Sequence, residues 1–354
     1  MSNDADDLAT ELFSTCPPIN HAQPEHYLER VAETARWSER AGCRGMLVYS
    51  DNSQADPWLV SHVIIQNTRS LCPLVAVQPV YMHPYTVAKA IASLAQLYRR
   101  RIYLNMVAGG FTNDLAALND PTPHDRRYAR LLEYTRLILQ LLRGEGPLSH
   151  TGEFYTVHNL RLQPPCPVEL LPGVLMSGSS EAGLAAARAL GATAIQYPKP
   201  ASEYPRAAAS SVTNSGIRIG IIAREDGAQA WAIARERFPE DRKGRLTHQL
   251  AMKVSDSVWH KQLSALAKTP DSHPYWLVPF ENYKTMCPYL VGSYSEVGSE
   301  LAGYLAHGYR SFITDIPPNP EELEHIGTAF DFARRQTHAA AAPTLGQRAS
   351  AASA

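Results

Sequence analysis

Short apolar segments alternate with amphipathic stretches along most of this chain, and this alternation constrains the fold more than any other feature. Residues 46–49 carry no charged side chain, which is typical of a strand buried on both faces of a parallel sheet. Between such segments, apolar residues recur at helical spacing, as at Val87, Ile91 and Leu94. The pattern predicts strands over residues 10–16, 45–50, 74–77, 102–107, 174–177, 194–197, 217–223 and 309–315.

Eight strands, seven of them followed by a recognisable helix, predict an α/β fold of the (β/α)8 TIM barrel type. A doubly wound open sheet is the alternative. Residues 239–286 fit no strand and helix pair, and we expect them to form an insertion after the seventh strand. The sequence therefore predicts a single domain over residues 1–337, followed by a disordered tail rich in Ala and Ser at residues 338–354.

The composition argues against several classes of function. Lys and Arg number 33 against 34 Asp and Glu, so the net charge of -1 provides no field to attract nucleic acid or an anionic membrane. No apolar run approaches the roughly 20 residues of a membrane helix. The five cysteines are odd in number and contain no Cys-x-x-Cys pair, which argues against disulfides and zinc and favours the cytoplasm. Neither a metal-binding His-x-x-x-His with a neighbouring Glu nor a Gly-x-Ser-x-Gly nucleophile motif occurs.

The stretch Ser177-Gly178-Ser179-Ser180 follows the fifth predicted strand and precedes a helix. Such a turn aims the free N–H groups of the helix start and nearby hydroxyls at one point, which can bind an anion. In a TIM barrel, phosphates are often bound at the loop after a late strand. The stretch is therefore a candidate phosphate site, with an ordinary serine cap as the alternative.

Arg218 lies in the seventh predicted strand, between Ile217 and Ile219. The side-chain period of two places the isoleucines on one face and Arg218 on the other, so Arg218 points into the barrel if the isoleucines face the helices. A charge inside the barrel is costly unless it is paired or meets an anionic ligand. Two hypotheses follow: an internal ion pair with a carboxylate, or a site for an anionic group.

Three further polar residues are candidates for a binding pocket. Asn105 is an amide in an apolar strand that ends near Gly109, where a flat ligand could approach the backbone; a satisfied core amide is the alternative. His124 and Tyr128 are four residues apart, so they share one face of the predicted helix. Surface packing would explain that spacing equally well.

Six segments in order resemble the bacterial luciferase-like flavin monooxygenases, most closely the alkanesulfonate monooxygenase branch. The resemblance extends from about residue 25 to 335. The matching segments are Asp56-Pro57-Trp58-Leu59-Val60, residues 69–79, residues 104–110 with Leu104-Asn105-Met106-Val107-Ala108-Gly109-Gly110, residues 124–128, residues 177–180, and residues 216–225.

The resemblance implies a TIM barrel that uses reduced FMN (FMNH2) supplied by a separate NAD(P)H:flavin reductase. Such enzymes react the flavin with O2 to give a C4a-peroxide that oxygenates the substrate. They occur as homodimers or homotetramers. Carried over by position, the resemblance assigns cofactor contacts to Asn105, Ala108, Ser177, Gly178, Ser179, Ser180 and Tyr128, and catalytic roles to Arg218, His124 and Tyr128.

The sequence departs from the sulfonate enzymes around the expected substrate. Their cysteine ahead of Asp-x-Trp is Gln54 here, their histidine after the strand-seven arginine is Gly220, and their Thr-Trp-Gly segment reads Gln196-Tyr197-Pro198. The resemblance implies that the insertion at residues 239–286 is a mobile lid. Only Lys284 offers a cation where the lid of the sulfonate enzymes has an arginine. The predicted substrate contacts are Gln54, Trp58, Tyr197 and Lys284.

These departures favour a two-component FMNH2-dependent monooxygenase that oxygenates a larger organic molecule, a biosynthetic intermediate, at N, S or C. The small-molecule substrate itself is left open. The alternatives are an alkanesulfonate monooxygenase that releases sulfite and aldehyde, and a flavin-binding protein without turnover. A deazaflavin in place of FMN also stays open.

Overall fold

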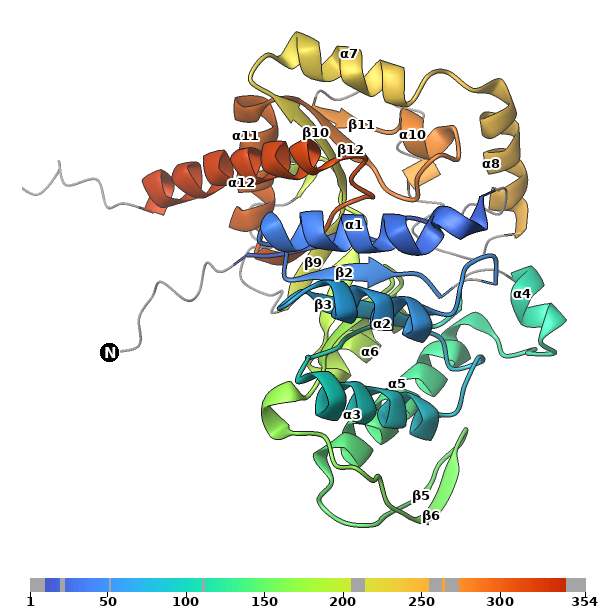
Figure 1. Cartoon of the computed structure of the whole chain (residues 1–354). Coiled ribbons are helices and arrows are strands. Elements are labelled where there is room, and N and C mark those ends of the chain that lie inside the picture. The colour runs from blue at the N-terminus through green and yellow to red at the C-terminus, as the bar shows by residue number, and fades with distance from the viewer. Residues whose placement is uncertain are drawn as a thin grey trace, which may run out of the picture.

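The centre of the molecule is a closed barrel of eight parallel strands (Figure 1). This computed structural model describes residues 10–19, 23–50, 52–109, 112–204, 214–254, 263–264 and 274–341. Neighbouring strands around the barrel are β1, β13, β9, β8, β7, β4, β3 and β2 in that order. The strands are β1 (Glu11–Thr15), β2 (Gly45–Val48), β3 (Cys72–Val77), β4 (Tyr103–Val107), β7 (Gly173–Ser177), β8 (Thr193–Gln196), β9 (Ser215–Arg218) and β13 (Tyr309–Ile313). The predicted TIM barrel is confirmed.

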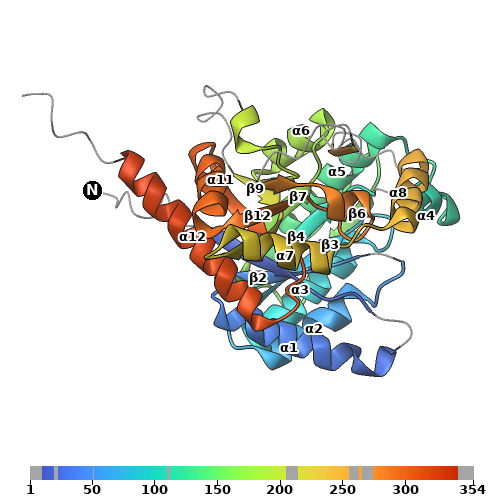
Figure 2. The same ribbon diagram turned by 90° about the horizontal axis from the view of Figure 1, so that it is seen from above.

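Helices surround the barrel, as Figure 2 shows from above. They are α1 (Tyr27–Arg40), α2 (Pro57–Asn67), α3 (Pro84–Tyr98), α4 (Thr112–Ala117), α5 (His124–Arg143), α6 (Glu181–Leu190), α7 (Gly227–Arg237), α8 (Arg242–Val254), α10 (Val278–Glu281), α11 (Tyr294–Ala306) and α12 (Pro320–Ala341). Their starts carry the expected chemistry: Asp56 accepts N–H bonds at the start of α2, and Ser293 and Glu296 form a capping box on α11.

The seventh predicted strand is divided in two. It leaves the barrel at Ile219, whose N–H still donates to the carbonyl of Ile313, and Gly220 then pairs away from the barrel. Strand β10 (Gly220–Arg224) joins a side sheet with β12 (Tyr289–Ser293) and β11 (Tyr275–Trp276). The sequence pattern did not predict β12 because this pairing joins segments about 70 residues apart.

The end of the predicted domain needs correction, and the insertion gains regular elements. Residues 239–286, which fitted no strand and helix pair, contain α8, β11 and α10. Helix α12 continues to Ala341, so the first residues of the predicted tail are helical, and residues 342–354 lie outside the described part of the chain. Between α5 and β7, the strands β5 (Leu148–Thr151) and β6 (Thr156–Leu160) form an antiparallel hairpin.

Apolar side chains form one layer inside the barrel and larger layers between barrel and helices. The inner layer consists of Phe13, Leu47, Cys72, Leu74, Tyr103, Leu175, Ile195 and Ile313. Ile217, Ile219 and Ile221 belong to the outer layer, beside Leu301 and Phe330 from the surrounding helices. The isoleucines therefore face the helices, as the period of two predicted.

Gly45 lies where the inner layer leaves no room for a side chain. A Cβ atom at this position would lie 2.3 Å from the carbonyl oxygen of Cys72 and 3.0 Å from the Phe13 ring. We predict that Gly45→Ala lowers the free energy of unfolding by about 1–3 kcal/mol, since backbone on the neighbouring strand must shift.

Gly327→Ala is the matched control, because a Cβ there meets nothing within 4 Å and the residue lies in helix α12. That change should be neutral or stabilising by up to about 1 kcal/mol. Urea unfolding of both variants measures the difference, and equal stabilities would contradict the packing argument.

Candidate active site

A cavity of about 490 Å³ lies at the carboxyl-terminal ends of the barrel strands. Active sites of TIM barrels occur at this end, because the loops after all eight strands meet there. Helices α4 and α5 and the insertion complete the wall. Of the predicted residues, the cavity is lined by Gln54, Asn105, Ala108, His124, Tyr128, Ser177, Gly178, Ser179, Ser180, Tyr197 and Arg218.

One end of the cavity is formed by the start of helix α6. The buried Ser180 is the N-cap, and its hydroxyl accepts a bond of 3.1 Å from the N–H of Gly183. The cap interpretation is therefore right for Ser180. The N–H groups of Glu181 and Ala182 have no acceptor within the helix, and the half-buried Ser179 lines the cavity beside them. This end of the cavity can bind a phosphate by helix N–H groups and a hydroxyl.

Tyr128 and His124 close the cavity next to this turn. A Cβ atom on Gly178 would lie 2.5 Å from the Tyr128 hydroxyl, so glycine is required for this close approach. His124 contacts Tyr128 edge-on, with ring centroids 5.4 Å apart, and its Nδ1 lies 2.8 Å from Asp125. The predicted shared helix face is confirmed. The Ser177 hydroxyl donates to the Oδ1 of Asn105 at 2.8 Å, which fixes the amide at the cavity wall.

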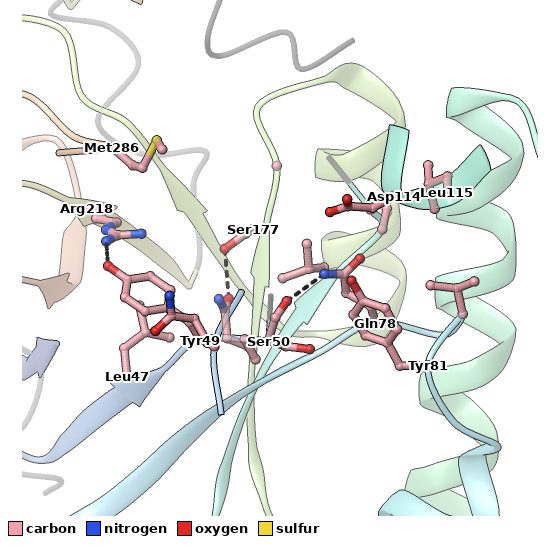
Figure 3. A pocket seen from close by; sticks show the side chains of 18 of the residues that line it. Leu47, Tyr49, Ser50, Gln78, Tyr81, Asp114, Leu115, Ser177, Arg218 and Met286 are labelled. Atoms are coloured by element: carbon pink, nitrogen blue, oxygen red, sulfur yellow. Dashed lines mark hydrogen bonds between the residues drawn. The ribbon is translucent and has the colours of Figure 1, made fainter. Parts of the chain in front are cut away.

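Arg218 occupies the other end of the cavity (Figure 3). Its side chain points inward, as predicted, and only 8% of the residue is exposed. The guanidinium donates to the Tyr49 hydroxyl and lies over the Tyr49 ring, with Cζ 5.3 Å from the centroid. Tyr197 also hydrogen-bonds with Arg218. Burial alone would lower the pKa of Arg218, but the surrounding Tyr49, Tyr197, Cys287 and Asp315 outweigh it and raise the pKa well above the usual value.

The charge of Arg218 has no ion-pair partner among the residues that the structure describes. No carboxylate lies within 4 Å of its guanidinium, and its buried Nε donates to nothing in this part of the chain. Asp315, whose charge helps to raise the pKa of Arg218, accepts a bond of 2.7 Å from the Tyr289 hydroxyl. The internal ion pair is therefore not found here, and the guanidinium is free to meet an anion.

Two predicted substrate contacts do not reach the cavity. The indole of Trp58 packs against the apolar layer between barrel and helices and is not part of the cavity lining. Lys284 forms an ion pair of 2.8 Å with Asp241 and is largely exposed. In this structure Lys284 faces Asp241 and is not part of the cavity lining.

Other residues line the cavity that the sequence analysis did not select. Tyr49 and Gln78 directly follow strands β2 and β3, and the Gln78 amide donates to the carbonyl of Ser50 at 2.9 Å (Figure 3). Their position at strand ends was a usable signal. Asp114, Tyr283 and Met286 come from α4 and from the insertion, whose course the apolar pattern does not reveal.

Comparison with known proteins identifies the family. The model of the luciferase-like monooxygenases matches residues 11–273. The chain belongs to this family. The luciferase-like monooxygenase described here is 34% identical over 325 residues to BtrO of Niallia circulans, a 4-(gamma-L-glutamylamino)butanoyl-[BtrI acyl-carrier protein] monooxygenase, covering 89% of this chain and 95% of BtrO.

Solved structures share the fold at low identity. EDTA monooxygenase of Chelativorans sp. BNC1 superposes with a TM-score of 0.69 at 16% identity, covering 93% of this chain and 95% of that chain. Long-chain alkane monooxygenase LadA gives 0.69 at 14% identity, covering 93% and 92%. The resemblance seen in the sequence is thus confirmed, and the protein is an enzyme of the flavin-dependent monooxygenase class.

The described residues contain neither a membrane-spanning helix nor a cluster of metal ligands. None of the helices in the ranges given above is long and apolar enough to cross a membrane. Within the same ranges, no group of three or more His, Cys, Asp or Glu side chains is arranged to hold a metal ion.

The loop that leads into α5 is anchored by Asp120. Its buried carboxylate forms a two-pronged pair with Arg130, at 2.6 and 3.1 Å, and accepts from Thr122. Burial alone would raise the pKa of Asp120, but the bonds from Arg130 and Thr122 lower it to about 2. This contribution to stability is full above the unfolded pKa of about 4 and is lost as the pH falls toward 2.

We therefore predict that Asp120→Asn lowers the free energy of unfolding by about 2 kcal/mol at pH 7. The difference from the wild type should shrink below about pH 4 and disappear near pH 2, as measured by urea unfolding across this range. Asp331→Asn, which breaks an exposed pair with Arg334, is the control and should cost less than about 0.5 kcal/mol. A pH-independent effect of Asp120→Asn would contradict the assignment.

Proposed function

We propose that this enzyme is a two-component monooxygenase that binds reduced FMN and oxygenates a biosynthetic intermediate with O2. The observation that carries the proposal is the cavity with two anion-binding ends, one at the start of α6 and one at the unpaired Arg218. A separate NAD(P)H:flavin reductase would supply the reduced flavin. The overall reaction consumes one O2 and the two electrons and two protons of the reduced flavin, inserts one oxygen atom and releases the other as water.

The residues present fit a flavin mononucleotide. The cavity volume of about 490 Å³ lies within the range of about 300–1,000 Å³ typical of cofactor and ligand sites. Ser179, Ser180 and the N–H groups of α6 offer donors to a phosphate, and the side chains of Asn105 and Tyr128 line the path from there toward Arg218. When bound, reduced flavin supplies the electrons that activate O2.

The protein's own contribution at the reactive end is a positioned positive charge in dry surroundings. Tyr49 and Tyr197 hold the guanidinium of Arg218, which leaves its other donors for negative charge that develops during the reaction. Leu47 and Met286 line the same end and exclude water. Residues 239–286 act as the lid in this proposal, through Tyr283 and Met286, and 255–262 and 265–273 of that insertion lie outside the described ranges.

The relative BtrO supports an acyl substrate attached to a carrier protein. Identity of 34% over nearly the whole chain makes a substrate of this type a better hypothesis than an alkanesulfonate. The position of Lys284 also argues against an alkanesulfonate. A sulfonate pocket would need a second cation beside Arg218, but Lys284 is paired with Asp241 outside the cavity.

The proposal is tested by supplying purified enzyme with FMN, NADH, a flavin reductase, O2 and 4-(gamma-L-glutamylamino)butanoyl thioester. We expect a product heavier by one oxygen atom. Arg218→Met should lower kcat about 100-fold or more with FMN affinity retained, because a charge that stabilises the transition state is lost. Lys284→Met, which removes a cation outside the cavity, should change kcat less than about twofold.

Absence of an oxygenated product, with a working reductase, would remove the proposed substrate class. Binding of reduced deazaflavin F420 but not FMN would replace the proposed cofactor. Tight FMN binding with no substrate-dependent oxygen consumption would identify a flavin-binding protein without turnover.

A second prediction concerns the phosphate end. Gly178→Ala places a methyl group 2.5 Å from the Tyr128 hydroxyl, so the turn must shift, and FMN affinity should fall about tenfold or more. Adding Tyr128→Phe removes the hydroxyl and should restore part of the affinity. Flavin fluorescence titration measures both, and the absence of any rescue would show that the contact does not limit binding.

A further inference from the structure

The outer face of helix α8 carries exposed leucines among basic residues. Leu246 and Leu250 are 61% and 63% exposed and lie four residues apart, on one face of the helix. Arg242 and Lys243 are exposed around them. We call Arg242, Lys243, Leu246 and Leu250 the α8 surface. The 13 residues of α8 include no Asp or Glu, although the whole chain has a net charge of -1.

The inner face of α8 reaches the cavity wall through one layer of side chains. The buried ring of His248 lies 4.6 Å from the ring of Phe280 and 6.2 Å from that of Tyr283, which lines the cavity. Arg245 donates to the Asn282 side chain at 3.2 Å. Helix α8 lies on the same side of the molecule as α4 (Figure 1 and Figure 2), and Leu118, just after α4, lines the cavity while being 48% exposed. The α8 surface is therefore next to the mouth.

We propose that the α8 surface docks an acidic carrier protein that presents the acyl substrate on a flexible thioester arm. The inference rests on the proposed function. A cavity of about 490 Å³ has no room for a protein domain, so the carrier must bind outside, within the arm's reach of the mouth. A basic face with two apolar side chains is complementary to an acidic surface with apolar contacts.

Charge also argues against a second copy of this chain as the occupant. A two-fold interface would place the α8 surface against its own basic residues, and like charges facing each other oppose association. The acids closest in sequence do not compensate fully: Asp241 is bound by Lys284 and by the N–H of Gly244, and Glu240 precedes the helix.

The experiment compares one acyl group presented in two ways. The substrates are 4-(gamma-L-glutamylamino)butanoyl on an acyl-carrier protein and the same acyl group on free pantetheine, with the complete FMN and reductase system. We expect Lys243→Glu combined with Leu250→Ser to lower kcat/KM for the carrier-bound substrate about tenfold or more, mainly through KM. For the pantetheine thioester, kcat/KM should change less than about twofold.

The control variant is Arg143→Glu combined with Val168→Ser. Arg143 is exposed at the end of α5, and Val168 is 75% exposed in the 3-10 helix Val168–Leu170 that precedes β7. Both lie toward the amino-terminal ends of the barrel strands, away from the cavity. This variant should behave as the wild type with both substrates.

Fluorescence anisotropy with the unloaded carrier protein gives an independent measurement. The affinity of the carrier protein for the enzyme should fall when salt is added, and it should be lower for the α8 variant than for the wild type. Equal losses with both substrates would overturn the docking proposal and assign α8 to lid movement. Three other outcomes would also overturn the docking proposal. They are an unchanged carrier affinity in the α8 variant, a changed oligomeric state of that variant, and binding of the enzyme to anionic vesicles without the carrier. If neither thioester is oxygenated, the proposed function fails. The docking proposal would still be supported if the carrier binds the wild type in a salt-sensitive way and does not bind the α8 variant.

Discussion

Closure of the barrel between its first and last strands is the constraint on which the site depends. Strands β1 and β13 pair in parallel, with Phe13 opposite Ile313, and the N–H of Thr314 donates to the carbonyl of Phe13 at 2.7 Å. This contact joins segments about 300 residues apart. Once the ring is closed, the carboxyl ends of all its strands meet at one mouth, so Tyr49, Asn105, Ser177 and Arg218 share a cavity although they lie far apart in the sequence.

The two ends of the cavity attract negative charge by different means. The end at α6 uses peptide N–H groups and hydroxyls beside the half-buried Ser179, where a phosphate keeps part of its hydration. The end at Arg218 uses a full charge that is more than nine-tenths buried and held by tyrosines. Electrostatic interactions are stronger where water is excluded, so chemistry that develops negative charge is favoured at the Arg218 end. The two ends thus differ in the donors that they offer to an anion and in their exposure to water.

Local patterns in the sequence predicted the parts of this arrangement that local physics determines. Apolar runs identified all eight barrel strands, the period of two oriented Arg218, and the preference of serine for helix starts identified the turn at Ser180. The failures are non-local. Strand β12 forms only by pairing with β10, and the direction of Lys284 depends on Asp241 some 40 residues earlier. Trp58 packs against an apolar layer built from several other elements, which no pattern within α2 reveals.

The bend after Arg218 brings Tyr289 against the end of β9. Gly220 has no side chain, and a Cβ there would lie 2.3 Å from the ring of Tyr289, so glycine allows this close packing. The sulfonate branch that the sequence resembles has a histidine at this position. From its place beside Gly220, the Tyr289 hydroxyl donates to Asp315, whose charge helps to raise the pKa of Arg218. The departure at Gly220 therefore acts on the surroundings of Arg218, because the space it leaves lets Tyr289 orient a carboxylate whose charge stabilises the guanidinium.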